Sequence, residues 1–441
     1  MAVSTFLRRL LGAKQQKVDR PTQDLGALCE ALLAEPAEFA GTSLARQALA
    51  AYKALDERCR HEFFDVLASA YSPSVEAVGA AADAYRLDPS PENFIRLQDA
   101  IDPPRQELFR RLNMAPGGTA ALVEMRRLLL KGLKANPRWR VIDADLRHLL
   151  RSWFNRGFLR MERIDWRTSA IVLEKLIQYE AVHAIHGWRD LHRRLEGDRR
   201  CYGFFHPQLP DEPIIFIEVA LTRGMSAHVQ PLLDINSPVA DPQSADSAIF
   251  YSITNCQEGL RGISFGNLLI KQVAEDLKRE FPHLERFATL SPVPGFRRWL
   301  EESRVRLALG AGGNERLALL ARLDDPAWHL GDIPKALEAL LTRLCAYYLL
   351  EAKQGAEPLD PVARFHLANG AALERLNWMG DSSEQGMARS AGMMVNYVYW
   401  LAEVEKNHER YFRDHAVVAS APLQKLAAES PLAGLDKGVA A

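Results

Sequence analysis

Apolar residues recur at spacings of three and four through most of residues 1–190, a pattern that predicts amphipathic helices. Helix breakers separate these segments at Pro73, at DPSP (88–91), at DPP (102–104) and at PGG (116–118). No repeat of fixed period is found, so a solenoid is not predicted. The sequence therefore predicts an all-helical domain over residues 1–190, with packing or subunit contact as its role. The periodic segments are RHEFFDVLASAY, VEAVGAAADAYRL, PENFIRLQDAI, PRQELFRRL and TAALVEMRRLLLKGL.

The pattern changes in the second part of the chain, residues 191–441. EPIIFIEVAL (212–221) is a nearly continuous apolar run and predicts a buried strand, and SAIFYSI (247–253) predicts a second. A glycine-rich turn follows, and then a helix with one apolar face. Helices are expected to return from about residue 325, through the segment FHLANGAALERLNWMGD. The apolar face of the helix after the turn carries Leu269, Val273, Leu277 and Phe281.

Two prolines stiffen the segment FATLSPVPGFRRWL (287–300). Pro292 and Pro294 each remove a backbone donor and fix φ, so this segment is predicted to be neither helix interior nor central strand. The result is a stiff loop that holds Ser291 in one position.

The glycine-rich turn GLRGISFGN carries Gly259, Gly262 and Gly266 directly before the helix. A diphosphate could bind the free backbone N–H groups of about 262–268 at the start of that helix. The turn matches neither the Walker A loop nor G-x-G-x-x-G, so a plain tight turn is an equal interpretation.

Composition narrows the class of protein. The 441 residues are 48% hydrophobic and 25% charged, and their formal net charge of −1 favours neither nucleic acid nor an anionic membrane. No apolar run approaches the length of a membrane span. Five cysteines lie far apart without a CxxC pair, which argues against a zinc site or a disulfide framework and favours a reducing compartment, so a cytoplasmic location is expected. The basic start of the chain could be an organelle presequence, but Asp19, Asp24 and the lack of a serine-rich tract favour a frayed first helix.

Longer strings carry a family resemblance. RGISFGNLLI resembles the coenzyme A loop of GNAT-type acetyltransferases, with Ser264 in place of one expected glycine. The segment from FYSITNCQEGL to FATLSPVPGFRRWL, together with FHLANGAALERLNWMGD and GMMVNYVYWL, resembles malonyl-CoA decarboxylase. The resemblance extends to YEAVHAIHGWRDLHRR and RRCYGFFHP, and it covers roughly residues 175–400 densely.

The resemblance implies an α/β catalytic domain of GNAT type after the helical domain. It implies conversion of malonyl-CoA to acetyl-CoA and CO₂ with no metal or organic cofactor, and a homotetramer with no nucleic-acid or membrane partner. Two other classes stay open, namely a GNAT-type acyltransferase with an amine acceptor and a non-catalytic acyl-CoA sensor. Loss of Ser291 or His366 would indicate the sensor, and both residues are present.

The resemblance also implies the site residues. Ser291 and His366 are the catalytic pair, with His366 as proton donor and Ser291 as its hydrogen-bonding partner; a nucleophilic Ser291 is a lower-ranked alternative. Further catalytic candidates are Ser252, which could be an ordinary strand serine, and Tyr399, which could pack in the core of an apolar helix. The coenzyme-binding stretch is Arg261, Gly262, Ile263, Ser264, Phe265, Gly266 and Asn267.

Two polar clusters have open interpretations. Glu180, His183 and His186 have three-residue spacing on one face of a predicted helix, but they lack a fourth ligand and the family uses no metal, so no metal site is predicted. The pairs Arg193/Arg194 and Arg199/Arg200 could meet coenzyme phosphates, although a solvated or interface face is favoured.

Overall fold

The computed structural model describes residues 18–263, 269–309 and 311–433, which form two compact units. The helical unit contains residues 18–160, 205–214 and 257–263. The sheet unit contains residues 161–204, 215–256 and the described chain from residue 269 onward. The division predicted after residue 190, which assigns assembly to one part and chemistry to the other, stays a prediction.

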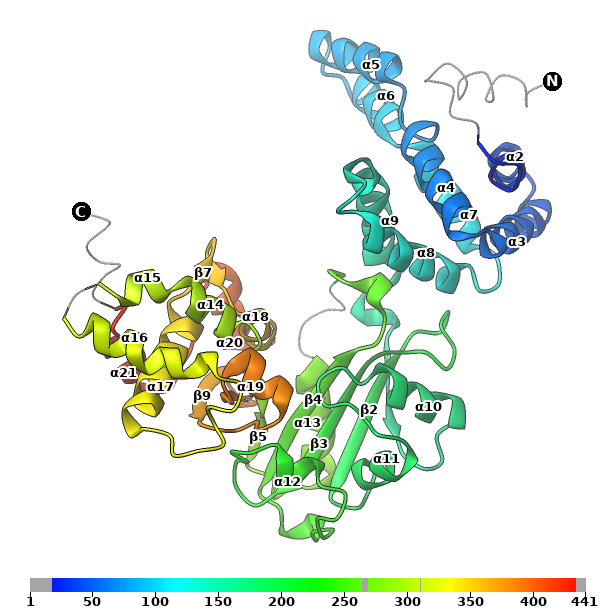
Figure 1. Ribbon diagram of the computed structural model, residues 1–441. Helices are drawn as coiled ribbons and strands as arrows, with labels where there is room; N and C mark the ends of the chain where they lie inside the picture. Colours follow the sequence, from blue (N-terminus) through cyan, green and yellow to red (C-terminus); the bar gives the residue numbers. More distant parts are fainter. Residues whose placement is uncertain (1–17, 264–268, 310, 434–441) are drawn as a thin grey trace. The chain divides into compact units, whose positions relative to one another are not determined.

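The helical unit confirms the helices that the spacing of apolar residues predicts (Figure 1). Capping side chains fix several starts: Asp56 accepts a hydrogen bond from the N–H of Cys59 at 2.7 Å, and Ser74 accepts one from Ala77 at 3.2 Å. Proline stands in the first turn of α6 and of α7, where its missing N–H costs no helical hydrogen bond. The elements are α2 (Arg20–Ala34), α3 (Glu38–Ala54), α4 (Glu57–Ser69), α5 (Val75–Leu87), α6 (Pro91–Ile101), α7 (Pro104–Asn113), α8 (Gly118–Gly132), η1 (Pro137–Trp139), α9 (Arg140–Trp153), η2 (Arg156–Phe158) and η4 (Glu258–Leu260).

Helices α5 and α6 form a hairpin whose apolar side chains are left uncovered. The two helices lie side by side (Figure 1), and the rings of Tyr85 and Phe94 contact each other across the pair in a tilted arrangement, with centroids 5.6 Å apart. Neither helix has a buried residue. Leu87 is 82% exposed and Ile95 is 55% exposed. A hairpin with this much exposed apolar surface is typical of a region that contacts another protein.

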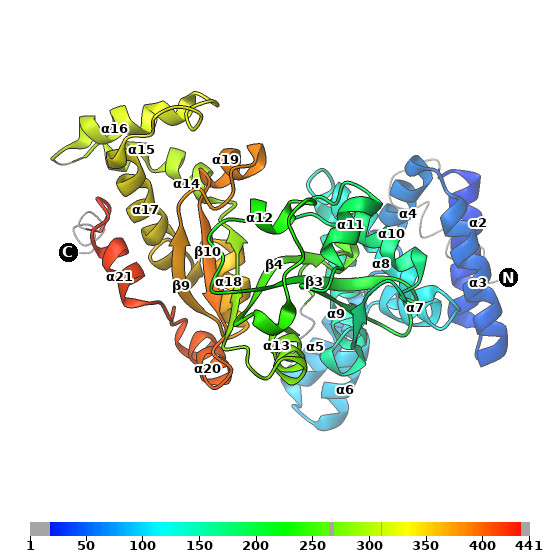
Figure 2. The ribbon, with the colours of Figure 1, turned by 90° about the horizontal axis from the view of Figure 1, so that it is seen from below.

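The sheet unit contains one sheet of eight described strands, in the order β1-β2-β3-β4-β5-β10-β6, with β9 also paired to β10 (Figures 1 and 2). β4 and β5 are parallel and are joined through α13, whereas β3 with β4 and β10 with its neighbours are antiparallel. The strands are β1 (Arg160–Ile164), β2 (Arg199–Phe205), β3 (Pro213–Thr222), β4 (Ser247–Asn255), β5 (Arg286–Thr289), β6 (Ser291–Pro292), β9 (Ala372–Asn377) and β10 (Met394–Val398), and β7 (Lys353–Gln354) and β8 (Glu357–Pro358) form a separate hairpin.

The predicted strands at 212–221 and 247–253 are confirmed as β3 and β4, and both are buried along most of their length. The predicted helix after the glycine-rich turn is α13. The four residues predicted for its apolar face are all buried, and the last of them, Phe281, directly follows the helix. The helices of this unit are α10 (Ala170–Tyr179), α11 (Trp188–Arg194), α12 (Gln230–Leu233), η3 (Pro242–Ser244), α13 (Leu269–Glu280), α14 (Phe296–Glu302), α15 (Arg304–Leu307), α16 (Gly313–Ala321), η5 (Arg322–Asp324), α17 (Lys335–Leu350), α18 (Pro361–Ala368), α19 (Glu384–Ser390), α20 (Val404–Asp414) and α21 (Ala421–Ala428).

Three expectations about secondary structure are wrong. Residues 160–164 form β1 inside the region predicted to be helical, because they pair with β2 at the sheet edge. The segment predicted to return to helix contains α18, but residues 372–377 form β9 because they pair with β10. Tyr399 directly follows β10 and does not lie on a helix. In each case sheet pairing overrides the local pattern.

Among the described residues, no helix is both long enough and apolar enough to cross a membrane.

Two glycines with positive φ allow a matched test of packing. Gly370, in the turn after α18, has φ +82°, and a Cβ added there would collide with the backbone carbonyl of Val404. Gly355, in the β7–β8 turn, has φ +64° with open space around it. We expect Gly355→Ala to lower the free energy of unfolding by about 1–2 kcal/mol, because only the left-handed backbone is strained. Gly370→Ala should cost about 2–5 kcal/mol, because overpacking adds to that strain.

Urea unfolding followed by circular dichroism compares the two variants. Equal losses in both would contradict the close approach of Val404 to the turn.

Candidate active site

Ser291 lies where the β5 chain changes partner. β5 pairs in parallel with β4 as far as Thr289 and Phe250. Among the described strands, β6, which begins at Ser291, then pairs only with β10. Ser291 is aligned with Val395 of β10 and is 6% exposed. The sequence predicts a stiff loop here that is not a central strand. The structure instead has the two-residue strand β6, which is the last strand in the sheet order and so is not central either.

His366 lies on α18, a short helix with a buried anchor. The carboxylate of Asp360 accepts hydrogen bonds from the N–H groups of Val362 at 3.0 Å and Ala363 at 2.8 Å, and it is fully buried. Tyr348 donates its hydroxyl to the same carboxylate at 3.3 Å. Burial raises the pKa of Asp360 to about 6. This cap fixes the start of the helix that carries His366.

A chain of hydrogen bonds connects three of the four predicted catalytic residues. Ser291 Oγ lies 3.0 Å from His366 Nε2, and Tyr399 Oη lies 2.8 Å from His366 Nδ1. Ser291 Oγ also donates to Thr289 Oγ1 at 2.9 Å, and the N–H of Tyr397 donates to the same threonine oxygen at 3.2 Å.

The donors in this chain define a tautomer. Ser291 gives its proton to Thr289, so it can only accept from His366 Nε2–H. Nδ1 then accepts from the Tyr399 hydroxyl. We assign this tautomer because it gives each of these donors an acceptor.

The imidazole is buried among rings. His366 is 3% exposed, and the ring of Tyr397 stacks on it with centroids 4.5 Å apart. Burial lowers the pKa of His366 to about 3, so the ring is uncharged at neutral pH. Burial likewise raises the pKa of Tyr399 far above its usual value.

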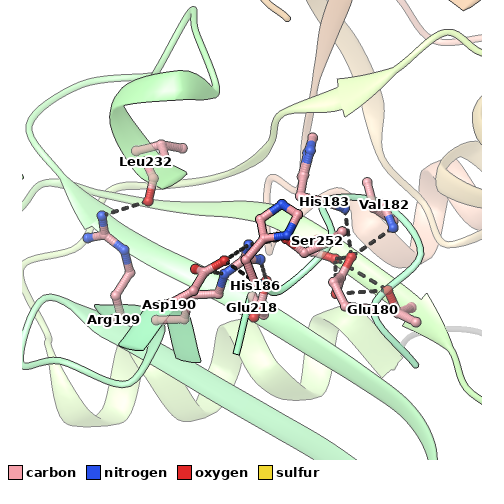
Figure 3. Close-up of polar contacts among 12 residues, drawn as sticks. Glu180, Val182, His183, His186, Asp190, Arg199, Glu218, Leu232 and Ser252 are labelled. Atoms are coloured by element: carbon pink, nitrogen blue, oxygen red, sulfur yellow. Dashed lines mark hydrogen bonds and ion pairs between the residues drawn. The ribbon is translucent and has the colours of Figure 1, made fainter. Parts of the chain in front are cut away.

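Ser252 belongs to a different cluster. Its Oγ lies 2.8 Å from both carboxylate oxygens of Glu180 (Figure 3) and 3.4 Å from Thr254 Oγ1. Among the described residues, no hydrogen bond joins it to Ser291 or His366. A β-bulge explains its direction, because Glu218 pairs with Ser252 while the adjacent Val219 pairs with Phe250.

The extra residue turns Ser252 to the face of Glu218. Phe250 points to the other face, where its ring contacts Tyr399 with centroids 6.3 Å apart. The structure therefore does not join Ser252 to the predicted pair.

Glu180, His183 and His186 lie after the end of α10, in the loop that leads to α11, and not on a helix (Figure 3). Glu180 accepts the N–H groups of the loop, and burial lowers the pKa of His183. In the part of the chain that the structure describes, ligand atoms come close enough for a metal only at Asp19, Cys59 and Glu62. The loop opens on a cavity of about 1050 Å³ whose lining includes His183 and Asp381 but not Ser291, His366 or Tyr399.

The four arginines at 193, 194, 199 and 200 are buried, so the expected solvated face is wrong. Burial of a guanidinium requires a partner, and each has an internal one. The contacts are Arg193 with Asp198 at 2.7 Å, Arg194 with Asp190 and Glu218 at 2.9 Å each, Arg199 with the Leu232 carbonyl at 3.2 Å and Arg200 with Glu280 at 2.6 Å.

The predicted coenzyme stretch is described only in part. Arg261 and Gly262 are exposed, and Ile263 is buried. Gly262 has φ +77°, with open space where a side chain would point, so its backbone can be approached closely. Ser264, Phe265, Gly266 and Asn267 lie outside the described residues.

The sequence analysis missed Thr289, Tyr397 and Asp360. Thr289 accepts the hydrogen bond of the Ser291 hydroxyl. The only sequence feature that could have indicated this is the Thr-x-Ser spacing before the prolines, which places both side chains on one face of a strand. Tyr397 lies two residues before Tyr399 in β10 and stacks on His366. Asp360 stands directly before Pro361, a pattern typical of a helix start.

Comparison with known proteins gives one consistent family. The family model "Malonyl-CoA decarboxylase C-terminal domain" matches residues 157–436, and "Malonyl-CoA decarboxylase N-terminal domain" matches residues 71–154. The mitochondrial malonyl-CoA decarboxylase of Anser anser anser is 38% identical over 350 residues, which is 74% of this chain and 69% of that protein. That of Rattus norvegicus is 36% identical over 359 residues, 76% of this chain and 73% of that protein.

Solved structures agree. The malonyl-CoA decarboxylase of Rhodopseudomonas palustris is similar with a TM-score of 0.88 and 49% identity, over 92% of this chain and 99% of that one. The malonyl-CoA decarboxylase of Agrobacterium vitis gives 0.84 and 46%, over 91% and 99%. The predicted fold class, a helical region followed by an α/β domain with a mixed sheet, is confirmed.

The buried imidazole makes a prediction about pH. The pKa of His366 is about 3 in the folded protein, whereas a histidine in an unfolded chain has a pKa of about 6.5. Below pH 6.5 the unfolded state therefore binds more protons, and this contribution to stability is lost as pH falls from 6.5 toward 3. Between pH 7.5 and 5.0 the wild-type protein should lose about 2 kcal/mol more stability than His366→Gln, whose side chain does not titrate.

Urea unfolding of both proteins at the two pH values measures this difference. Equal losses would mean that His366 is not held in its uncharged form.

Proposed function

Because the chain belongs to the malonyl-CoA decarboxylase family, we propose that it converts malonyl-CoA to acetyl-CoA and CO₂ at Ser291, His366 and Tyr399. The observation that carries this proposal is the buried hydrogen-bonded chain Tyr399–His366–Ser291. Family membership favours this reaction over acyl transfer to an amine and over a sensor without catalysis.

The reaction needs one proton and a place for negative charge. When the bond between C2 and the carboxylate breaks, its electron pair moves into the thioester and forms an enolate, and CO₂ leaves. Donors must stabilise the charge on the thioester oxygen, and an acid must protonate C2. The net reaction therefore takes up one proton for each CO₂ released.

The imidazole of His366 can deliver that proton once substrate binding has protonated it. His366 is neutral in the free protein because burial lowers its pKa to about 3. The malonyl carboxylate brings a negative charge to the site, which favours protonated His366, so we propose that the ring gains its proton as the substrate binds. Tyr399, bonded to Nδ1, would hold the ring in position.

Ser291 stands between the ring and C2 in this scheme. Rotation of its hydroxyl away from Thr289 would direct the proton to C2, while Oγ takes the proton of His366 Nε2. His366 is then the donor through Ser291, and no acyl-enzyme forms. The apolar surroundings also favour loss of CO₂, because they solvate a localised carboxylate poorly.

We propose that the coenzyme binds along residues 261–267. The exposed Gly262, with its positive φ, supports this assignment, as does the position of the stretch between β4 and α13. We also propose a cytoplasmic location, which the wide spacing of the five cysteines without a CxxC pair supports, and cell fractionation would test it.

A homotetramer is our proposal for the assembly. The apolar surface of α5 and α6 supports it, since Leu87 and Ile95 are exposed to 82% and 55% in the single chain. A second copy of the chain is the partner that would cover this surface.

The assay for the proposed function is CO₂ and acetyl-CoA release from malonyl-CoA alone. We expect His366→Ala and Ser291→Ala each to lower kcat by ~10²–10⁴-fold with a much smaller change in KM. The double variant should cost little more than either single one, because the two residues act as a unit. Absence of CO₂ release by the wild-type protein would reject the proposed function. If the kcat losses of the two single variants multiply in the double variant, Ser291 and His366 act independently and do not form a catalytic pair.

Two tyrosines provide a matched control for the ring. Tyr399 bonds His366 Nδ1, whereas the Tyr397 hydroxyl is buried without a partner in the described structure, although its ring stacks on the same imidazole. Tyr399→Phe should therefore lower kcat, and Tyr397→Phe should leave kcat within about threefold of the wild type. The reverse order would show that Nδ1 does not need its hydroxyl partner.

The assembly has its own prediction. Light scattering at micromolar concentration should give a tetramer for the wild-type chain and a smaller species for Ile95→Glu, because a charge on α6 disfavours burial of this surface. The control is Val305→Glu, since Val305 is 78% exposed in the sheet unit and lies outside the hairpin. A wild-type protein that is monomeric and fully active would contradict the proposed homotetramer.

A further inference from the structure

Thr289 lies at the end of the hydrogen-bonded chain that contains His366. Side chains alternate between the two faces of an extended segment, and Ala288 and Leu290 belong to the buried apolar cluster on one face. Thr289 and Ser291 therefore share the opposite face, where the Ser291 hydroxyl donates to Thr289 Oγ1 at 2.9 Å. Thr289 is fully buried, and a hydrogen bond is stronger in such surroundings than in water.

Two contacts from β10 fix the position of Thr289. The backbone N–H of Tyr397 donates to Thr289 Oγ1 at 3.2 Å, and the side-chain amide of Asn396 donates to the Thr289 carbonyl at 2.6 Å. A backbone N–H can only donate, so one lone pair of Oγ1 is used by Tyr397 and the other accepts from Ser291. The threonine oxygen is thus held between two strands as an acceptor.

This acceptor decides the direction of the hydrogen bonds at His366. The Ser291 hydroxyl has one proton, and Thr289 takes it. Only lone pairs of Ser291 Oγ then face His366 Nε2, 3.0 Å away, so Nε2 carries the ring proton. Nδ1 is left as the acceptor of the Tyr399 hydroxyl at 2.8 Å. All three protons of the chain therefore point toward Thr289.

Without that acceptor, the same protons have a second arrangement. The Ser291 hydroxyl can turn and donate to Nε2, the ring proton then belongs to Nδ1, and the Tyr399 oxygen accepts it. No proton is gained or lost, because the serine, the ring and the tyrosine keep one each. The two arrangements differ in whether Ser291 presents a lone pair or a proton to the ring, and the bond to Thr289 favours the lone pair.

Resting on the proposed function, we propose that Thr289 is a positioning residue that acts through Ser291. By accepting the Ser291 proton, it keeps His366 in the Nε2–H tautomer in the free protein. The proposed relay needs this arrangement, because Ser291 must take a proton from Nε2 while it gives its own to C2. A serine that donates to Nε2 would first have to turn away from the ring.

Nitrogen NMR of isotopically labelled histidine rings measures the tautomer without turnover. The signals of His366 are identified by their absence in His366→Gln. We expect the ring proton on Nε2 in the wild-type protein and on Nδ1 in Thr289→Val, whose side chain has a similar size but no acceptor oxygen. Thr289→Ser keeps the oxygen, so it should retain the Nε2–H tautomer.

Steady-state rates give a second readout. Thr289→Val should lower kcat for malonyl-CoA by about 2–12-fold, the range for one hydrogen bond, and leave KM within about twofold. Thr289→Ser should have a kcat within about twofold of the wild type. In a Ser291→Ala background, Thr289→Val should have no further effect, because the threonine acts through that serine.

Thr254→Val is the matched control. Thr254 is a buried threonine of β4 in the same sheet, and its hydroxyl donates to Glu180 at 3.1 Å. The substitution removes a buried hydrogen bond and leaves the chain at His366 intact. The tautomer should stay Nε2–H, with kcat within about twofold of the wild type. A change of tautomer in this variant would mean that loss of any buried hydroxyl disturbs the ring, and it would overturn the proposal.

The outcomes separate this inference from the proposed function. A wild-type protein that releases no CO₂ from malonyl-CoA contradicts the function, whereas the tautomer of the free protein still tests Thr289. The role of Thr289 is overturned by an Nδ1–H tautomer in the wild type, by an Nε2–H tautomer in Thr289→Val, or by a Thr289→Ser variant that behaves like Thr289→Val. If Thr289→Val does not fold, Thr289→Ala removes the same acceptor and is judged in the same way.

Discussion

His366 is held at both ring nitrogens, by Ser291 on one side and Tyr399 on the other, in a buried part of the sheet unit. A buried imidazole without partners would leave two polar atoms unsatisfied, and a charged one would need a counter-ion. The described chain meets the first requirement with two hydroxyls and avoids the second by keeping the ring neutral. Charge therefore enters the proposed site with the substrate. The malonyl carboxylate brings the negative charge that favours protonation of His366, and its loss as CO₂ is the step that requires the proton.

Strand β4 separates two polar systems that differ in their electrostatics. On the face of Phe250 and Ser291 the groups are hydroxyls and a neutral ring. On the face of Ser252 and Glu218 they are ion pairs, with Arg194 between two carboxylates and burial raising the pKa of Glu218 to about 8. One extra residue in β4 decides to which of these systems Ser252 belongs. The bulge thus decides which polar groups surround this serine, without any substitution of the residue itself.

Local patterns predicted what depends on local structure. The 3.6-residue period predicted α5 and α6 at their observed bounds, because their caps and apolar spacing lie within their own residues. The apolar runs predicted β3 and β4, because these strands are buried on both faces. The family strings gave Ser291, His366 and Tyr399, and the structure joins all three. Ser252 joined Glu180 instead, since one residue of register decides its face and no single-strand pattern records register.

The buried arginines follow the same logic. In the sequence, Arg193 and Arg194 look like a charged surface. Their ion-pair partners, Asp198 and Glu218, can be identified only from the folded structure, in which α11 packs on the sheet.

The separation in sequence between Ser291 and His366 is 75 residues, and that between His366 and Tyr399 is 33. Contacts of this span close large loops and form after local helices do. Recovery of activity during refolding should therefore lag behind recovery of helical signal, and it would report when the two distant parts of the sheet unit meet.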